Sequence, residues 1–172
     1  MKYLDTLKIK KYIGDGFKIV PKSDGIYYFK ENETFSHYTD VNYINSLYNS
    51  NIDIDNIKSN ILVLGLEMGC TPHWLSNVCP FSNIDVVEPN KELITAIHSM
   101  GYLLNKIKIH HDDVFSFIPS IKYDIIITDI WWEINNQTLS DIQTLREHYN
   151  PYLKLNGKFY TPFIEPYSYE KL

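Results

Sequence analysis

Cysteine, long hydrophobic runs and an N-terminal leader pattern are all scarce or missing in this chain of 172 residues. Its two cysteines, Cys70 and Cys79, are too far apart for a Cys-x-x-Cys redox or zinc pair, so we expect two reduced thiols. The apolar runs are far shorter than the ~20 residues that span a bilayer, and Met1–Asp5 lacks the apolar stretch of a signal peptide. We therefore expect a cytoplasmic protein without a membrane partner.

Positive charge is also scarce. Lys and Arg together number 16 against 21 Asp and Glu, which gives a formal net charge of −5. Such a chain is repelled by phosphate backbones, so we expect no nucleic-acid partner, whereas an acidic pocket would attract a small cationic molecule. With 44% hydrophobic residues, a chain of this length can bury roughly 70% of its unfolded surface. The composition indicates one compact domain.

Short β-type runs separated by turn residues fill the first part of the chain. They cover residues 7–13, 17–20, 26–30 and 34–38, with Gly, Asp, Asn and Ser between them. This pattern is typical of β-hairpins. Asp40 precedes apolar residues at helical spacing, so we expect it to cap a short helix. The sequence thus predicts an N-terminal appendage, residues 1–58, in front of a core formed by residues 59–172.

The core is organised around the apolar run Ile61–Leu64, which breaks at Gly65 and enters a helical pattern after Gly69. The next β-type run, Ile84–Glu88, follows after one helix-sized interval, which indicates a βαβ unit. In such a unit the glycine loop lets backbone N–H groups approach a ligand, and an acid that ends the second strand binds ribose hydroxyls. Gly65, Gly69 and Glu88 are therefore candidates for a nucleoside site.

The alternation of strand and helix patterns continues to the end of the core. Further strands are expected at residues 107–109, 123–129 and 158–161. We expect one helix to begin at Pro89 and to end at Gly101, and a short helix after Asp113 to be closed by Pro119. A capping-box pattern at residues 138–141 predicts the start of the last helix.

This order of elements predicts an α/β fold: a Rossmann-like, doubly wound, mostly parallel sheet of order 3-2-1-4-5 with its ligand site at the carboxyl ends of the strands. The sheet is truncated after the fifth strand, which leaves that strand as an edge. Natural proteins cover such edges, and two-fold symmetry is the commonest form of oligomer. We therefore expect a homodimer, or hairpins folded over the core.

Four motifs in this order resemble those of class I S-adenosylmethionine (SAM) dependent methyltransferases, with spermidine synthase as the most similar branch. They are Leu64–Gly69, Val86–Asn90, Asp112–Phe115 and Tyr123–Asp129. The resemblance covers residues 60–162, and the hairpin-rich N-terminus is similar to the β region that precedes the core in spermidine synthases. The resemblance implies that the cofactor is SAM or decarboxylated SAM.

The resemblance also implies roles for individual residues. The loop at Gly65 and Gly69 would pass the methionine part of SAM, and Glu88 would hold the ribose. Asp113, with Asp112 as the neighbouring candidate, would accept a hydrogen bond from the adenine amino group. Asp129 would face the substrate.

The chain departs from this family pattern in the loop and beyond the fourth strand. Glu67 stands where the loop usually has a second glycine, so its side chain must point away from the carboxylate of SAM or repel it. Spermidine synthases carry an acid one position later, where this chain has Met68. Their second substrate-side acid is replaced by Trp132, with Glu133 beside it. These departures leave open whether the cofactor is SAM or its decarboxylated form.

Each candidate also has a purely structural interpretation. Glu88 can be a solvated strand end, and Asp112 and Asp113 can simply cap the turn that follows them. Asp129 would accept a hydrogen bond or a proton from an attacking amine. Trp131 and Trp132 cannot both point the same way, so we expect Trp132 to line the site and Trp131 to pack.

Two histidine-containing segments complete the candidates. His73, in the first turn after the glycine loop, is either a substrate contact or a surface residue. Residues 110–113, His-His-Asp-Asp, contain metal-ligating atoms, but neighbouring strand residues alternate faces and no further ligands are indicated. We expect no metal site.

The sequence thus favours a SAM-dependent transferase that acts on a small, amine-bearing molecule, with methyl transfer slightly ahead of aminopropyl transfer. A non-catalytic nucleoside-binding or assembly module of the same fold is the alternative. An enzyme that breaks SAM without a second substrate is a lesser possibility.

Overall fold

The computed structural model describes residues 12–14, 17–21, 25–30, 37–40, 58–101, 103, 106–131 and 135–161. An antiparallel sheet in the order β1-β2-β3-β4 forms the N-terminal part. Its strands are β1 (Tyr12–Gly14), β2 (Phe17–Pro21), β3 (Gly25–Lys30) and β4 (His37–Asp40). The antiparallel pairing expected of hairpins is confirmed, while residues 7–11 and 34–36 of the predicted strands lie outside the described residues. The helix expected after Asp40 lies outside the described residues, and the domain boundary after residue 58 stays a prediction.

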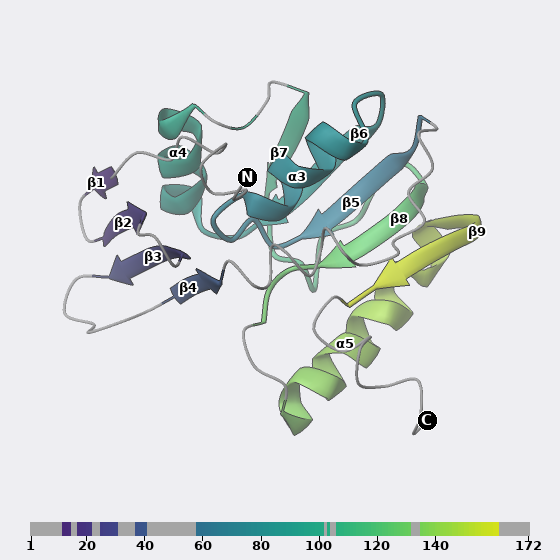
Figure 1. Cartoon of the computed structure of the whole chain (residues 1–172). Helices are drawn as coiled ribbons and strands as arrows, with labels where there is room; N and C mark the ends of the chain where they lie inside the picture. Colours follow the sequence, from purple (N-terminus) through teal and green to yellow (C-terminus); the bar gives the residue numbers. More distant parts are fainter. Residues whose placement is uncertain are drawn as a thin grey trace.

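A second sheet of five parallel strands forms the core, in the order β7-β6-β5-β8-β9 (Figure 1). The strands are β5 (Asn60–Leu64), β6 (Asn83–Glu88), β7 (Ile107–His111), β8 (Tyr123–Thr128) and β9 (Leu153–Tyr160). Counted from the start of the core, this is the predicted order 3-2-1-4-5. The Rossmann-like fold class is therefore confirmed.

Helices cover both faces of this sheet (Figure 1). Helices α3 (Cys70–Val78) and α4 (Lys91–Met100) pack on one face, and α5 (Asn136–Tyr149), followed by the short helix η1 (Asn150–Tyr152), packs on the other. Along β5, Ile61 and Val63 point into the first core, while Leu62 and Leu64 point into the second. A strand buried on both faces explains the uninterrupted apolar run in its sequence.

The N-terminal sheet is attached to the core through a buried side chain. Ile19 of β2 has no exposed surface and belongs to the same hydrophobic cluster as Leu93 and Ile97 of α4. The described residues contain no helix that combines the length and apolar character needed to cross a bilayer.

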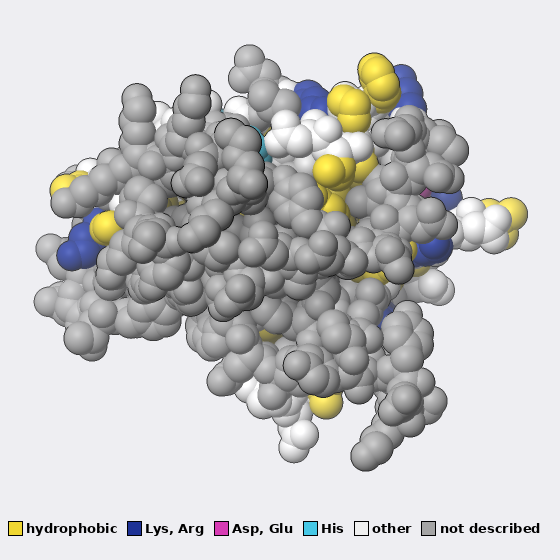
Figure 2. All heavy atoms as spheres, in the orientation of Figure 1, with side chains coloured by type: hydrophobic (Ala, Val, Ile, Leu, Met, Phe, Trp, Pro, Cys, Tyr) yellow, Lys and Arg dark blue, Asp and Glu magenta, His cyan; other side chains and the backbone are white. Residues whose placement is uncertain are grey.

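Some of the large exposed hydrophobic side chains lie in loops that precede strands. Phe81 lies just before β6 and Ile121 just before β8, with 71% and 43% of their surface exposed. Figure 2 shows hydrophobic side chains beside Lys or Arg side chains on one face of the molecule. Phe81 and Ile121 lie at the amino ends of β6 and β8, opposite the end where ligands bind in such folds.

Two predicted helix starts are wrong by a few residues. Helix α4 begins at Lys91, not at Pro89, because the Asn90 side chain accepts hydrogen bonds from the N–H groups of the first turn and so caps it. Helix α5 is capped by Asn135, whose side chain accepts from the Thr138 N–H. Thr138 is therefore inside the helix rather than its cap. The predicted end of α4 at Gly101 is confirmed.

The short helix expected after Asp113 is also wrong, because residues 114–116 form a turn. The carbonyl of Val114 accepts from the Tyr149 hydroxyl at 2.7 Å, and the carbonyl of Phe117 lies 2.9 Å from His148 Nε2. Since side chains of α5 take these carbonyls and Pro119 follows, a helix has no room to extend.

Strand β9 begins at Leu153, five residues before the predicted start at Lys158. Leu153 pairs with Tyr123, and Lys158 pairs with Ile125, so the register shifts between them. Asn156, with a φ of 67°, lies within this irregular segment of β9.

Candidate functional site

The loop that follows β5 has a left-handed backbone at three positions: Gly65 (φ 99°), Glu67 (φ 49°) and Gly69 (φ 72°). A Cβ atom added at Gly65 would lie 2.1 Å from the backbone oxygen of Asp129. Gly65 is therefore required both by its φ and by the close approach of the chain after β8. The Gly69 N–H donates to the Leu66 carbonyl at 2.7 Å and closes the loop just before α3.

Glu88 is the last residue of β6, and only 7% of its surface is exposed. Its Oε2 accepts a hydrogen bond from the Leu66 N–H at 3.0 Å, and its Oε1 accepts one from the Asn90 N–H at 2.8 Å. Each carboxylate oxygen has a second lone pair, so Glu88 can also accept from a ligand. Glu88 thus ties the glycine loop to the end of β6, a role that the sequence did not reveal.

Burial raises the pKa of Glu88, although the N–H groups of Leu66 and Asn90 favour its charged form. The charge of Glu67 raises this pKa further, and that of His111 lowers it. The neighbouring Glu67 charge indicates that the two carboxylates share one electrostatic environment.

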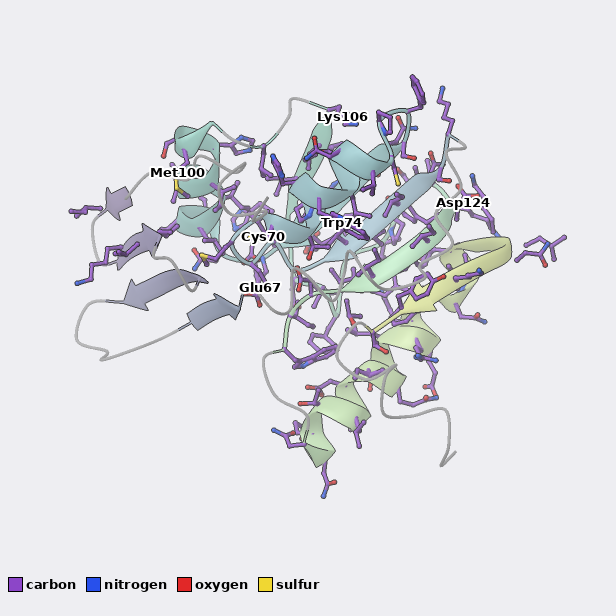
Figure 3. The ribbon with its side chains drawn as sticks, viewed as in Figure 1. Glu67, Cys70, Trp74, Met100, Lys106 and Asp124 are labelled. Atoms are coloured by element: carbon purple, nitrogen blue, oxygen red, sulfur yellow. The ribbon has the colours of Figure 1, made fainter. Side chains whose placement is uncertain are left out.

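Asp129 follows β8, and 5% of its surface is exposed. Its N–H donates to the Leu64 carbonyl at 2.7 Å, which fixes it beside the start of the glycine loop. Burial, then the charge of Asp129 and then that of Glu67 raise the pKa of the Cys70 thiol. Figure 3 shows Glu67 and Cys70 at the turn between β5 and α3. The carboxyl edge of the sheet therefore carries Glu67, Glu88 and Asp129 close to one loop, in an arrangement that favours a cationic ligand.

Asp112 and Asp113, which follow β7, are both exposed. Asp112 Oδ1 accepts from the Asp113 N–H at 2.8 Å, and Asp113 Oδ1 accepts from the Phe115 N–H at 3.0 Å. The backbone N–H of Asp112 reaches the Glu88 carbonyl at 3.3 Å. The structure thus brings this turn to the end of β6, and adenine binding by Asp113 stays a prediction.

His73 lies on α3, half-buried, with Nδ1 3.2 Å from the Asn77 side-chain nitrogen one turn later. Burial lowers the pKa of His73, which favours the neutral ring. Trp131 packs against the cluster under α5, as expected. Trp132 and Glu133 lie outside the described residues.

The histidines before Asp112 have structural partners. His110 Nε2 lies 2.9 Å from Asp85 Oδ1, and the Tyr123 hydroxyl donates to Asp85 Oδ2 at 3.0 Å. His111 Nε2 lies 3.0 Å from the Pro89 carbonyl. Within the ranges that the structure describes, no group of three or more His, Cys, Asp or Glu residues is arranged to hold a metal ion.

Comparisons of the sequence with protein-family models and with curated proteins gave no match. Solved structures do match. The chain is similar to a probable spermidine synthase from Corynebacterium glutamicum, with 23% identity and a TM-score of 0.63 over 89% of this chain and 63% of that one. It is also similar to coclaurine N-methyltransferase bound to N-methylheliamine and S-adenosylhomocysteine, with 17% identity and a TM-score of 0.54 over 81% of this chain and 39% of that one.

A further neighbour is the glycopeptide N-methyltransferase MtfA complexed with SAM, with 12% identity and a TM-score of 0.51 over 69% of this chain and 53% of that one. The chain spans less than two thirds of the length of each of these neighbours. The similarities show that this chain has the fold of class I SAM-dependent methyltransferases.

Proposed function

We propose that the protein is a SAM-dependent transferase that acts on a small, amine-bearing molecule. The observation that carries the proposal is Glu88, a buried carboxylate at the end of β6 that is bonded to the glycine loop. An acid in this place, next to the first strand of a doubly wound sheet, suits the hydroxyls of a ribose. The structural neighbours that hold SAM or S-adenosylhomocysteine support the choice of cofactor.

Each candidate residue at the carboxyl edge would contact a different part of the ligands. Glu88 would accept from the ribose hydroxyls, Asp113 would accept from the adenine amino group, and the loop at Gly65 and Gly69 would lie against the rest of the nucleoside. Asp129, on the other side of β5, would accept a hydrogen bond or a proton from the attacking amine. When bound, SAM supplies a carbon that its sulfonium already activates, so the protein mainly has to align amine and carbon.

Calorimetry of the full chain against SAM, S-adenosylhomocysteine and methylthioadenosine tests the proposal. Glu88→Ala should weaken binding about tenfold or more, because charge-assisted hydrogen bonds to the ribose are lost. Glu92→Ala, an exposed acid in the first turn of α4, is the matched control and should bind normally. If the wild-type protein binds none of these compounds, the proposal is wrong.

Aminopropyl transfer from decarboxylated SAM is a second candidate, which Glu67 favours. Its charge in the loop would repel a ligand carboxylate and attract a bare ammonium. In addition, Pro72 removes one of the backbone N–H donors from the first turn of α3, where a carboxylate would otherwise find them.

Product analysis separates the two reactions, with putrescine as the probe amine. Methyl transfer releases S-adenosylhomocysteine, whereas aminopropyl transfer releases methylthioadenosine. If aminopropyl transfer is correct, decarboxylated SAM should bind more tightly than SAM. Glu67→Gln should then reduce the difference in affinity between the two ligands. A wild-type preference for SAM would contradict this candidate and leave methyl transfer in place.

We also propose that the protein is a homodimer in the cytoplasm. In the described sheet β9 is the outermost strand, beyond β8, and the outermost strand of a sheet is a place where a second copy of a chain can add a strand. Light scattering tests this. A mass that stays that of a monomer across concentrations would contradict the dimer without touching the proposed reaction.

A further inference from the structure

Three large apolar side chains are exposed at the amino edge of the core sheet, the end at which strands β5 to β9 begin. Phe81 precedes β6, Ile121 precedes β8, and Leu155 lies near the start of β9 with 94% of its surface exposed. Single exposed apolar residues are normal on a protein surface, whereas several of them at one edge indicate a site of interaction.

Leu155 lies in a tight turn within β9. Residues 154–157 of this strand lie opposite a single residue of β8, Asp124, between two paired positions. A Cβ atom added at Gly157 would lie 3.0 Å from the Lys154 carbonyl oxygen, so the chain folds closely on itself here. The turn therefore presents Leu155 to the surroundings instead of packing it against the sheet.

Hydrogen bonds join the loops of this edge into one surface. Ser82 Oγ accepts from the Ser59 N–H at 3.2 Å, which ties the loop before β6 to the start of β5. Asn60 Nδ2 donates to the Lys122 carbonyl at 3.2 Å, which ties the loop before β8 to the same place. The Asn60 N–H donates to Asp124, the residue opposite the turn in β9. The three apolar side chains thus belong to neighbouring loops.

Lysine side chains accompany the apolar ones at this edge. They are Lys58, Lys106, Lys122 and Lys154. Lys106 Nζ donates to the carbonyls of Ser76 and Pro80 at 2.9 and 3.0 Å, which holds its charge beside the loop before β6 (Figure 3). Figure 2 shows hydrophobic side chains next to Lys or Arg side chains on the side where β5, β8 and β9 begin.

The amino edge is therefore basic, although the whole chain has a net charge of −5. Asp124 is the one acid in the described strand starts and the loops before them, and Lys154 Nζ lies 2.7 Å from its carboxylate. These segments are residues 58–60, 80–83, 106, 120–124 and 150–157. The acids Glu67, Glu88 and Asp129 lie at the opposite, carboxyl edge.

Exposed apolar side chains between lysines suit the surface of a membrane that contains anionic lipids. The apolar groups enter the headgroup region, and the lysines attract the lipid charges. A folded protein partner would need a matching hollow for each protruding side chain, whereas lipids adapt to any shape. This contrast favours a membrane over an acidic protein.

The net negative charge does not prevent such binding in this orientation. The acids of the carboxyl edge are separated from the amino edge by the length of β5, five residues or about 17 Å. This distance exceeds the Debye length of about 8 Å at physiological ionic strength, so their repulsion is largely screened.

We propose that the amino edge of the core sheet binds the surface of anionic membranes, with Phe81, Ile121 and Leu155 entering the headgroup region between lysines. The proposal does not depend on the proposed function, because this surface lies at the other end of the strands. The carboxyl edge would face solution and stay open to its ligands. The short apolar runs of the sequence exclude a spanning segment, but single side chains on a folded surface are enough for peripheral binding.

Sedimentation of the full-length protein with lipid vesicles tests the proposal. The protein should bind vesicles of equal parts phosphatidylserine and phosphatidylcholine, bind vesicles of phosphatidylcholine alone much more weakly, and dissociate as the salt concentration rises. Lys58→Glu and Lys122→Glu should each weaken binding about fivefold or more. The matched control is Lys91→Glu, an exposed lysine that begins α4 at the carboxyl edge and should bind as the wild type does.

Leu155→Ser separates the apolar contribution from the charge. It should weaken binding to the anionic vesicles about tenfold, because the leucine no longer enters the headgroup region. Ile13→Ser, which changes a side chain of β1 with 70% of its surface exposed, is the matched control and should have no effect. Since Leu155 is almost fully exposed, its variant should unfold at the wild-type denaturant concentration and keep the wild-type mass in light scattering.

Three results would overturn the proposal. The first is a wild-type protein that does not bind the anionic vesicles, or binds both kinds equally. The second is a lower mass for Leu155→Ser, which would assign this side chain to a contact between copies of the chain. The third is normal vesicle binding by Leu155→Ser together with displacement by soluble polyglutamate, which would assign the lysines to an acidic protein segment. Calorimetry with nucleosides tests the proposed function separately, so either idea can fail without the other.

Discussion

The two edges of the central sheet are built differently. At the amino edge, polar groups pair with one another: the Asn60 N–H donates to Asp124 Oδ2 at 2.8 Å, Lys154 Nζ lies 2.7 Å from the same oxygen, and Asn83 Nδ2 donates to Asn60 Oδ1. At the carboxyl edge, the loop after β5 carries left-handed residues, including the non-glycine Glu67, and the first turn of α3 carries a buried threonine without a partner.

This difference indicates that the amino edge stabilises the sheet, whereas the carboxyl edge is arranged for binding a nucleoside. Paired groups at the amino edge tie the neighbouring strands β6, β5, β8 and β9 to one another. Strain and unpaired groups persist only where the surrounding structure enforces them, and they gather at functional sites. The carboxyl edge therefore is the end at which changes should affect nucleoside binding, and the amino edge the end at which they should affect stability and leave nucleoside binding unchanged.

The largest effect should follow Gly65→Ala. The added Cβ would meet the Asp129 backbone oxygen at 2.1 Å in a left-handed conformation, so neither the loop nor β8 can keep its place. We expect a loss of about 3 kcal/mol or more in the free energy of unfolding, measured by denaturant titration followed by circular dichroism. The control is Gly101→Ala, which has the same sign of φ (69°) but no atom within 4 Å and should lose only about 1 kcal/mol. Equal losses would contradict the close approach.

Glu67→Gly should act in the opposite direction. Glycine adopts a φ of 49° without the penalty that a side chain incurs, so the variant should be more stable by about 1 kcal/mol in the same titration. A destabilised variant would indicate that the Glu67 side chain holds the loop together. In either case the change tests whether this edge carries strain.

Lys154→Ala addresses the amino edge. It removes the ion pair with Asp124, in which both side chains are more than a third exposed, so the loss should be about 0.2–1 kcal/mol. Nucleoside affinity should not change. A loss of nucleoside affinity in Lys154→Ala would contradict the claim that changes at the amino edge leave nucleoside binding unchanged.

The smallest effects should appear in the pH dependence of stability, with opposite signs at the two edges. Burial raises the pKa of Glu88 in the folded protein. The stability that Glu88 contributes is therefore fully present below its usual pKa of 4.5, and it is lost as the pH rises through the raised pKa of the folded state. Burial also acts on Asp124, but the hydrogen bonds from Lys154 and Asn60 and the Lys154 charge outweigh it and lower the pKa. The contribution of Asp124 is therefore present above 3.8 and is lost as the pH falls through the lower folded value.

Unfolding titrations across the acid range check this, with Glu88→Gln and Asp124→Asn as the variants. Each substitution should remove the change of unfolding free energy with pH that its own carboxyl group causes, and it should leave the change caused by the other group in place. Variants that change the pH profile in the same direction would contradict the assigned shifts.

The sequence predicted the parts of the structure that depend on local patterns. The uninterrupted apolar run at Ile61–Leu64 indicated a strand buried on both faces, and the interval to Glu88 indicated the βαβ unit that places this acid at the carboxyl edge. The strand order followed from the alternation of strands and helices. Gly101 was recognised as a helix end because a left-handed C-cap has a strong residue preference.

Contacts between segments far apart in the chain could not be predicted in this way. The turn after Asp113 replaced a helix because Tyr149 and His148, more than thirty residues later, take its carbonyls. Glu88 was expected to bind a ribose, but its hydrogen bond to the Leu66 N–H depends on how the loop returns to the end of β6.

By itself, then, the sequence determined the Rossmann-like fold and the positions of its strand-terminal acids, because periodicity and turn preferences are local. Only the tertiary structure decided that Thr71 is buried without a partner, that Glu67 is held in a left-handed backbone, and that Gly65 lies against Asp129. These features arise where α3, β5 and β8 meet, and whether a polar group has a partner is set by packing rather than by its neighbours in the chain.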